Sequence, residues 1–161
     1  MRVGEAIEVI QRTARTKPLA GLWNLLLAFW SRKQEPLRVR SQPFILQLEP
    51  TIKCNLRCKM CDQPFWNRME PDFTLERFES ILAQFPHLKR LKLQGLGEPL
   101  LNKQFLHMVE RAEERGIRVI VYTNANLIGP EQAEDIIRTG IEEIWVSLDG
   151  ATAETYEEIR D

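Results

Sequence analysis

The sequence predicts an α/β protein in which strands alternate with helices, as in a parallel sheet or part of a β/α barrel. From residue 44 onward, short apolar runs with the β-strand period are separated by segments whose apolar residues recur at helical spacing. The last three predicted strands begin about 26 to 28 residues apart, close to the length of a βαβ unit. The strands are also apolar enough to be covered on both faces.

Length and composition are those of a single soluble domain. The 161 residues are 43% hydrophobic and 28% charged, which indicates a globular protein with a sizeable core. The net charge of −1 provides no overall attraction for nucleic acid, so we expect no nucleic-acid partner.

Residues 1–43 are predicted to form helices and a connector. Residues 1–31 have a helical pattern interrupted near Pro18, and the polar stretch 31–43 is typical of a connector. Within them, "LAGLWNLLLAFW" is shorter than the about 20 apolar residues of a membrane span, and no small-residue cleavage site follows it. We expect no membrane span and interpret this segment as a helix docked on the domain, with an interfacial membrane helix as the alternative.

Residues 44–161 are predicted to form the core. Its strands are expected at 44–50, 90–94, 117–123 and 143–150. Its helices are expected at 74–85, 103–116, 130–140 and from 152 onward. Thr74 is the expected N-cap of the first of these helices, Pro130 suits a first helical position, and Gly116 and Gly140 suit helix ends.

Cys54, Cys58 and Cys61 lie close together after the first predicted strand, and the chain has no other cysteine. An odd, clustered set does not suit a disulfide framework and indicates a reducing compartment, so we expect a cytoplasmic protein. Thiolates suit zinc, copper(I) or iron–sulfur clusters. A zinc site would need a fourth ligand such as His87 or His107, which we interpret as surface or packing residues. Three thiols and an open position favour a four-iron cluster with one iron free for another molecule.

Polar or glycine-rich stretches follow the other three strands: "QGLGEPLLN", "TNANLIGP" and "SLDGATAET". In parallel β/α proteins, ligands bind beyond the carboxyl ends of the strands, where such loops converge. We therefore expect these stretches and the cysteines to form one site.

The spacing Cys54-x-x-x-Cys58-x-x-Cys61 resembles the cluster motif of the radical S-adenosylmethionine (radical SAM) enzymes, whose core is a partial β/α barrel. The similarity runs from about residue 44 to residue 161. It implies a [4Fe-4S] cluster on the three cysteines and S-adenosyl-L-methionine as a second cofactor. The residues that resemble the SAM contacts of the family are Gly95, Gly97, Glu98, Pro99, Thr123, Asn124, Ser147 and Asp149.

Each resemblance implies a role. Residues 95–99 look like the signature that meets the amino group of SAM, residues 123–124 like a polar turn, and Ser147 and Asp149 like ribose and carboxylate contacts. Met60 stands where the family commonly has an aromatic residue, and it is large enough to cover an adenine. Each motif also has an ordinary interpretation: Glu98 as a helix cap, 149–150 as a turn and 123–124 as a strand end.

The family implies that a reduced cluster cleaves SAM to a 5'-deoxyadenosyl radical, which abstracts hydrogen from a substrate, with an external reducing electron donor. The motifs look most like the maturases and iron–sulfur oxidoreductases that carry a cysteine-rich C-terminal extension, in which peptide or protein modification is frequent. That extension is absent from these 161 residues. The molybdenum-cofactor cyclase type is a rival subgroup.

The family core usually has six β/α units, and only four strands are predicted here. We therefore expect a partial barrel of about four strands with an exposed apolar edge. Two functions stay open. One is a radical SAM enzyme, or a fragment of one, acting on a peptide, protein or small molecule. The other is a non-catalytic domain that binds an iron–sulfur cluster or zinc.

Overall fold

The computed structural model describes residues 18–62 and 71–160. Helix α2 (Pro18–Gln34) comes first, and a short 3-10 helix, η2 (Pro99–Leu101), lies in the loop after the second strand. The remaining elements alternate between strand and helix along the chain: β1 (Ile45–Leu48), α3 (Leu75–Gln84), β2 (Arg90–Leu93), α4 (Phe105–Glu114), β3 (Arg118–Thr123), α5 (Pro130–Thr139), β4 (Glu143–Val146) and α6 (Ala153–Arg160).

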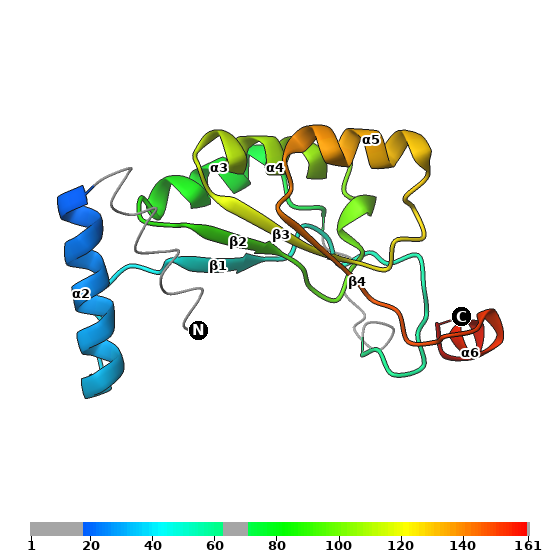
Figure 1. Cartoon of the computed structure of the whole chain (residues 1–161), viewed down its shortest axis with the longest axis horizontal. Coiled ribbons are helices and arrows are strands. Elements are labelled where there is room, and N and C mark those ends of the chain that lie inside the picture. Colours follow the sequence, from blue (N-terminus) through cyan, green and yellow to red (C-terminus); the bar gives the residue numbers. More distant parts are fainter. Residues whose placement is uncertain (1–17, 63–70, 161) are drawn as a thin grey trace.

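The four strands form one parallel sheet in the order β1-β2-β3-β4. Helices α3, α4 and α5 each return the chain to the start of the next strand, and they lie together over one face of the sheet (Figure 1). The carboxyl ends of all four strands therefore lie at the same end of the molecule. The predicted α/β fold with a partial parallel barrel of four strands is confirmed.

The core lies between these helices and the sheet. Side chains of adjacent strand residues point to opposite faces, so alternate positions of each strand enter this core. The buried apolar cluster consists of Phe78, Leu82, Leu88, Leu91, Leu93, Phe105, Met108, Val109, Ala112, Ile117, Val119 and Val121. The other face carries polar residues such as Gln47 and Lys92, which are register partners. Among the described elements, helices cover only one face of the sheet. The sequence had predicted that both faces would be covered.

The helix ends follow local signals in the sequence. The Thr74 hydroxyl caps α3 by accepting a hydrogen bond from the backbone N–H of Arg77 over 3.3 Å. Pro130 opens α5, and Gly140 ends it with a φ of 81°. Gly116, after α4, has a φ of 69°. These positive φ values are in the left-handed region that glycine enters without a Cβ clash, so the predicted helix ends are confirmed.

Some element bounds differ from the predictions. Strand β4 ends at Val146 rather than at residue 150, and α4 begins at Phe105 because η2 and a turn precede it. Helix α2 continues to Gln34, beyond Ser31, where the sequence predicted a connector. The helical prediction for residues 1–17 lies outside the described residues.

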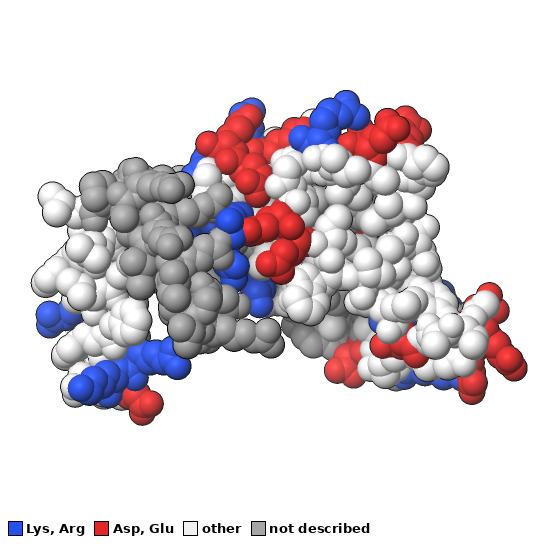
Figure 2. All heavy atoms as spheres, in the orientation of Figure 1, with Lys and Arg blue, Asp and Glu red and all other residues white. Residues whose placement is uncertain are grey.

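Helix α2 lies beyond the amino end of β1, away from the carboxyl end of the sheet (Figure 1). Its Asn24 side chain donates to the Gln42 carbonyl over 3.1 Å and accepts from the Gln42 N–H over 2.8 Å. Its last turn carries Arg32 and Lys33, and basic side chains gather at that end of the molecule in Figure 2. The apolar side chains that α2 exposes are Leu19, Leu22, Trp23, Leu26, Phe29 and Trp30. No helix in the described ranges is long and apolar enough to cross a membrane.

Candidate functional site

The loops that follow the four strands line one cavity of about 480 Å³. Because the strands are parallel, these loops meet at the carboxyl end of the sheet. The predicted site residues that line this cavity are Cys54, Cys58, Met60, Cys61, Gly95, Gly97, Glu98, Thr123, Asn124, Ser147 and Asp149. Pro99 is the exception, since it is buried at the first position of η2. The tertiary structure thus brings the four predicted loops into one site.

The cysteine loop has no helix or strand in its described part, residues 49–62. Backbone hydrogen bonds tie it to two other parts of the site. The Glu98 N–H donates to the Lys53 carbonyl over 2.7 Å, and the Lys59 N–H donates to the Ile159 carbonyl of α6 over 2.9 Å. Its position therefore depends on the loop after β2 and on α6.

The three cysteines are free thiols of intermediate exposure. Burial raises the pKa of the Cys58 thiol above its ordinary value, the Arg160 guanidinium opposes this rise, and the nearby thiols of Cys54 and Cys61 add to it. The thiols of Cys54 and Cys61 are therefore both within electrostatic range of Cys58. A bound metal group would favour their thiolate forms, because its positive charge stabilises the negative sulfur.

The donor set of the cavity suits an iron–sulfur cluster, because it consists of three thiols. In the described part of the chain, no three Cys, His, Asp or Glu side chains are close enough together to hold one metal ion. Neither histidine lines the cavity, and His107 lies on the surface of α4 with its Nδ1 3.1 Å from Glu110 Oε2. Three soft thiols that line one cavity suit an iron–sulfur group.

Glu98 joins the loop after β2 to the end of β3. Its side chain is buried, and the residue is 2% exposed. Oε1 accepts from the Thr123 hydroxyl over 2.7 Å and from the Leu100 N–H over 3.3 Å, while Oε2 accepts from the Asn124 N–H over 2.8 Å. The carboxylate therefore caps η2, as its ordinary interpretation expects, and also lines the cavity. Since a carboxylate has about four acceptor sites and these bonds use three, one acceptor site remains.

The glycines of this loop stand where the chain approaches itself closely. A Cβ on Gly97 would lie 2.0 Å from the backbone oxygen of Thr51, and a Cβ on Gly95 would lie 2.0 Å from Glu49 Oε1. The same Glu49 oxygen accepts hydrogen bonds from the backbone N–H groups of Leu96 and Gly97. The two glycines thus allow the loops after β1 and β2 to approach each other closely.

Asn124 links three of the motifs. Its backbone N–H contacts Glu98, and its side-chain Nδ2 donates to Asn55 Oδ1 over 2.9 Å and lies 4.0 Å from Cys54 Sγ. Its Oδ1 accepts from the backbone N–H of Asn126 over 3.0 Å. With 8% exposure, Asn124 is a buried connection between the end of β3 and the first thiol.

Ser147 and Asp149 follow β4 at the cavity wall. The Ser147 N–H donates to the Thr123 carbonyl over 2.9 Å, which continues the β3–β4 pairing by one position. The Asp149 carboxylate accepts from Arg160 Nε over 2.5 Å. This pair brings the last residue of α6 into the cavity wall, beside the cysteine loop.

Two larger side chains complete the wall. Met60 is 58% exposed, so its thioether is free to cover a ligand. Tyr122 stacks on Trp145 of β4 with ring centroids 5.6 Å apart and ring planes 16° apart.

Sequence reasoning missed Glu49, Tyr122 and Arg160. Glu49 directly follows β1, and a carboxylate just after a strand of a parallel sheet is a signal that could have identified it. Tyr122 lies inside an apolar strand pattern, and no neighbouring residue indicates that it lines a site rather than packs in the core. Arg160 lines the cavity because of where α6 lies, and the residues next to Arg160 in the sequence do not predict that position.

Comparison with known proteins identifies relatives. The family model described as the Radical SAM superfamily matches residues 48–161. The tungsten-containing aldehyde ferredoxin oxidoreductase cofactor-modifying protein of Pyrococcus furiosus is 35% identical over 107 residues, which are 65% of this chain and 30% of that protein. The mycofactocin maturase MftC of Mycobacterium tuberculosis is 30% identical over 119 residues, which are 73% of this chain and 30% of that protein.

The fold is also that of SuiB from Streptococcus suis. Its structure bound to S-adenosylmethionine matches with a TM-score of 0.65 and 22% identity, over 98% of this chain and 38% of SuiB. A structure of SuiB bound to its precursor peptide SuiA matches with a TM-score of 0.64 and 23% identity, over 91% of this chain and 33% of SuiB. The chain spans about a third of the length of the curated relatives it matches.

Proposed function

Because the chain belongs to the radical SAM superfamily, we propose that residues 44–161 form the part of a radical SAM enzyme that holds a [4Fe-4S] cluster and S-adenosyl-L-methionine. The observation that carries this proposal is that three thiols and the loops after all four strands line one cavity. Residues 1–43 form a separate helical segment and connector in this proposal.

The three cysteines would ligate three irons of the cluster. The 161 residues contain no fourth cysteine, so one iron would be left for a ligand from outside the cysteine loop. Arg160 supplies a positive charge close to Cys58, which offsets part of the negative charge that three thiolates and a cluster bring to this wall.

The polar residues of the cavity suit the two ends of SAM. The remaining acceptor site of Glu98 suits an ammonium group, because a buried carboxylate forms a strong charge-assisted hydrogen bond with it. Gly95 and Gly97 keep the backbone beside Glu98 free of side chains, and Pro99 fixes the start of η2 behind it. Thr123 holds the Glu98 carboxylate in place.

On the nucleoside side, the Ser147 hydroxyl and the Asp149 carboxylate suit the ribose hydroxyls, since they offer a donor and an acceptor after the same strand. Asn124 holds the turn after β3 against the cysteine loop. Met60 has an exposed, polarizable side chain that suits an adenine face. When bound and reduced, the cluster and SAM supply a 5'-deoxyadenosyl radical that abstracts hydrogen from a substrate.

We propose a peptide or protein as the substrate, with a small molecule as the alternative. The support comes from the relatives, which include a protein named as a maturase and a neighbour whose structure holds its precursor peptide. An external reductant would supply the electron. The free, clustered thiols support a reducing compartment such as the cytoplasm.

The test is anaerobic reconstitution with iron and sulfide, followed by dithionite and SAM, with chromatography for 5'-deoxyadenosine. The expected result is 5'-deoxyadenosine from the wild-type chain and none from Cys58→Ala, which lacks one cluster ligand. A wild-type chain that binds zinc but no iron and sulfide would overturn the proposal. A cluster without 5'-deoxyadenosine would instead mean that these residues bind a cluster but do not cleave SAM by themselves.

A further inference from the structure

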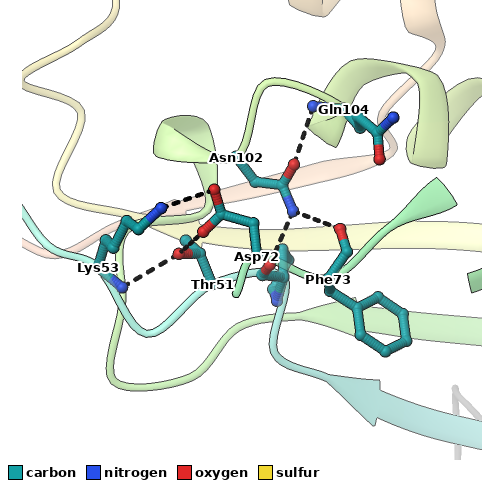
Figure 3. A network of polar contacts seen from close by, with 7 residues as sticks. Thr51, Lys53, Asp72, Phe73, Asn102 and Gln104 are labelled. Carbon is teal, nitrogen blue, oxygen red and sulfur yellow. Dashed lines mark hydrogen bonds and ion pairs between the residues drawn. The ribbon is translucent and has the colours of Figure 1, made fainter. Parts of the chain in front are cut away.

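A group of polar contacts, which we call the clasp, closes the base of the cysteine loop (Figure 3). The clasp consists of Thr51, Lys53, Asp72 and Asn102. The Thr51 hydroxyl donates to Asp72 Oδ1 over 2.7 Å, across 21 positions of the chain, and Lys53 Nζ donates to Asp72 Oδ2 over 2.9 Å. The Thr51 oxygen in turn accepts from the Lys53 N–H over 3.1 Å. One carboxylate therefore joins the two ends of the segment that carries all three cysteines.

Asn102 holds the same two ends from the other side. Its Nδ2 donates to the carbonyls of Pro50 and Phe73, over 2.7 Å and 2.9 Å. Its Oδ1 accepts from the Gln104 N–H over 2.9 Å, which fixes the amide in the turn after η2. The Phe73 N–H also donates to the Pro50 carbonyl over 3.0 Å. Asn102 is 3% exposed, so these contacts are sheltered from water.

The clasp has consequences for the thiols, because it joins the two ends of the loop that carries them, in addition to the contacts that Asn124 and α6 make with the same loop. Residues 49–62 lack regular structure, and Lys53 immediately precedes Cys54. Bringing the ends of a loop together costs conformational entropy. The hydrogen bonds of the clasp offset this cost, and they do not depend on a bound metal. Asp72 is held as a carboxylate, since the hydrogen bonds from Thr51 and Lys53 lower its pKa below the ordinary value.

We propose that the clasp is a positioning device for the cluster: it keeps the two ends of the cysteine loop together, so that the chain retains the cluster for longer. This inference rests on the proposed function. Thr51, Asp72 and Asn102 are positioning residues in it, and they do not touch the cluster themselves.

The test measures how fast a ferrous-iron chelator removes iron from anaerobically reconstituted protein. Thr51→Val keeps the shape of the side chain but loses the hydroxyl, and we expect iron release about tenfold faster than from wild type, since a hydrogen bond to a charged group is lost. Thr51→Ser keeps the hydroxyl and should restore the wild-type rate. The matched control is Thr139→Val, which removes a buried hydroxyl that donates to the Ile136 carbonyl over 2.7 Å in α5.

A second variant covers the case in which Thr51→Val does not fold. Asp72 has a side chain that is 31% exposed, so Asp72→Asn is tolerated more easily and should also speed iron release. Equal rates of iron release from wild type, Thr51→Val and Asp72→Asn would overturn the proposed role of the clasp but not the proposed function. An equally fast release from Thr139→Val would also overturn it, because general destabilisation would then explain the effect. Failure of the wild-type chain to bind iron and sulfide at all would overturn the proposed function as well.

Discussion

The hydroxyl of Thr123 donates a hydrogen bond of 2.7 Å to the carboxylate of Glu98, across 25 positions of the chain. Thr123 ends β3, and Glu98 lies in the loop after β2. Both residues are buried, so this contact ties two cavity loops together where water does not compete for it.

We expect Glu98→Gln to lower the free energy of unfolding by about 1 to 3 kcal/mol, because both carboxylate oxygens accept hydrogen bonds whereas the amide NH₂ group that replaces one of them cannot accept any. Urea unfolding followed by circular dichroism measures this change. Glu134→Gln, on the exposed side of α5, is the control and should change the free energy by less than about 0.5 kcal/mol. A Glu98→Gln variant as stable as the control would contradict the role of the contact.

Gly97→Ala should displace the loop after β2. The new Cβ would lie 2.0 Å from the Thr51 carbonyl oxygen, which belongs to rigid backbone, so one of the two loops has to move. We expect a lower free energy of unfolding and less iron bound per chain after reconstitution. Gly129→Ala is the matched control, since no atom lies within 4 Å of its new Cβ, and it should bind iron like wild type.

The acid stability of the chain should depend on Asp72. Hydrogen bonds from Thr51 and Lys53 lower its pKa below the ordinary value of 3.8. The folded chain therefore binds fewer protons at this group than the unfolded chain, and its contribution is present above that value and lost as the pH falls toward the folded pKa. We expect the free energy of unfolding to fall less steeply with acidification in Asp72→Asn than in wild type. Urea midpoints between about pH 5 and pH 3 measure the slope, and equal slopes would count against the prediction.

The β4 edge should make this chain self-associate. Strand β4 pairs only with β3 among the described strands, and Val146 and Leu148 are 53% and 68% exposed. Unpaired backbone groups beside apolar side chains are a template for association, as the sequence led us to expect. We expect large species in sedimentation velocity that decrease in Val146→Lys. Ile137→Lys, which replaces an exposed apolar residue on α5, should leave them unchanged. A monomeric wild-type chain would refute this prediction.

The features that the sequence predicted well are those with local causes. Thr74 caps α3, Pro130 opens α5 and Gly140 ends it, because each of these residues acts on its own turn of backbone. The convergence of the four loops was also predictable, since parallel strands joined by helices must place their carboxyl ends together. The cavity that these loops line follows from that rule.

The features that the sequence did not predict depend on contacts between distant segments. Pro99 is turned into the protein rather than toward the cavity, because η2 forms there. Asp149 is paired with Arg160, and Glu49 holds the backbone of the glycine loop, although neither partner is adjacent in sequence. Such pairs form only after the sheet and its helices have brought the segments within hydrogen-bond distance.

The sequence alone determined the alternation of strands and helices, the three thiols with their spacing, and the order of the polar motifs after the strands. These are properties of residue type and periodicity, which a linear chain already contains. Only the tertiary structure decided that Glu98 is held by Thr123 and that Asp72 and Asn102 close the cysteine loop. The reason is physical: a hydrogen bond between distant residues depends on packing that places two atoms about 3 Å apart, and no local pattern encodes that distance.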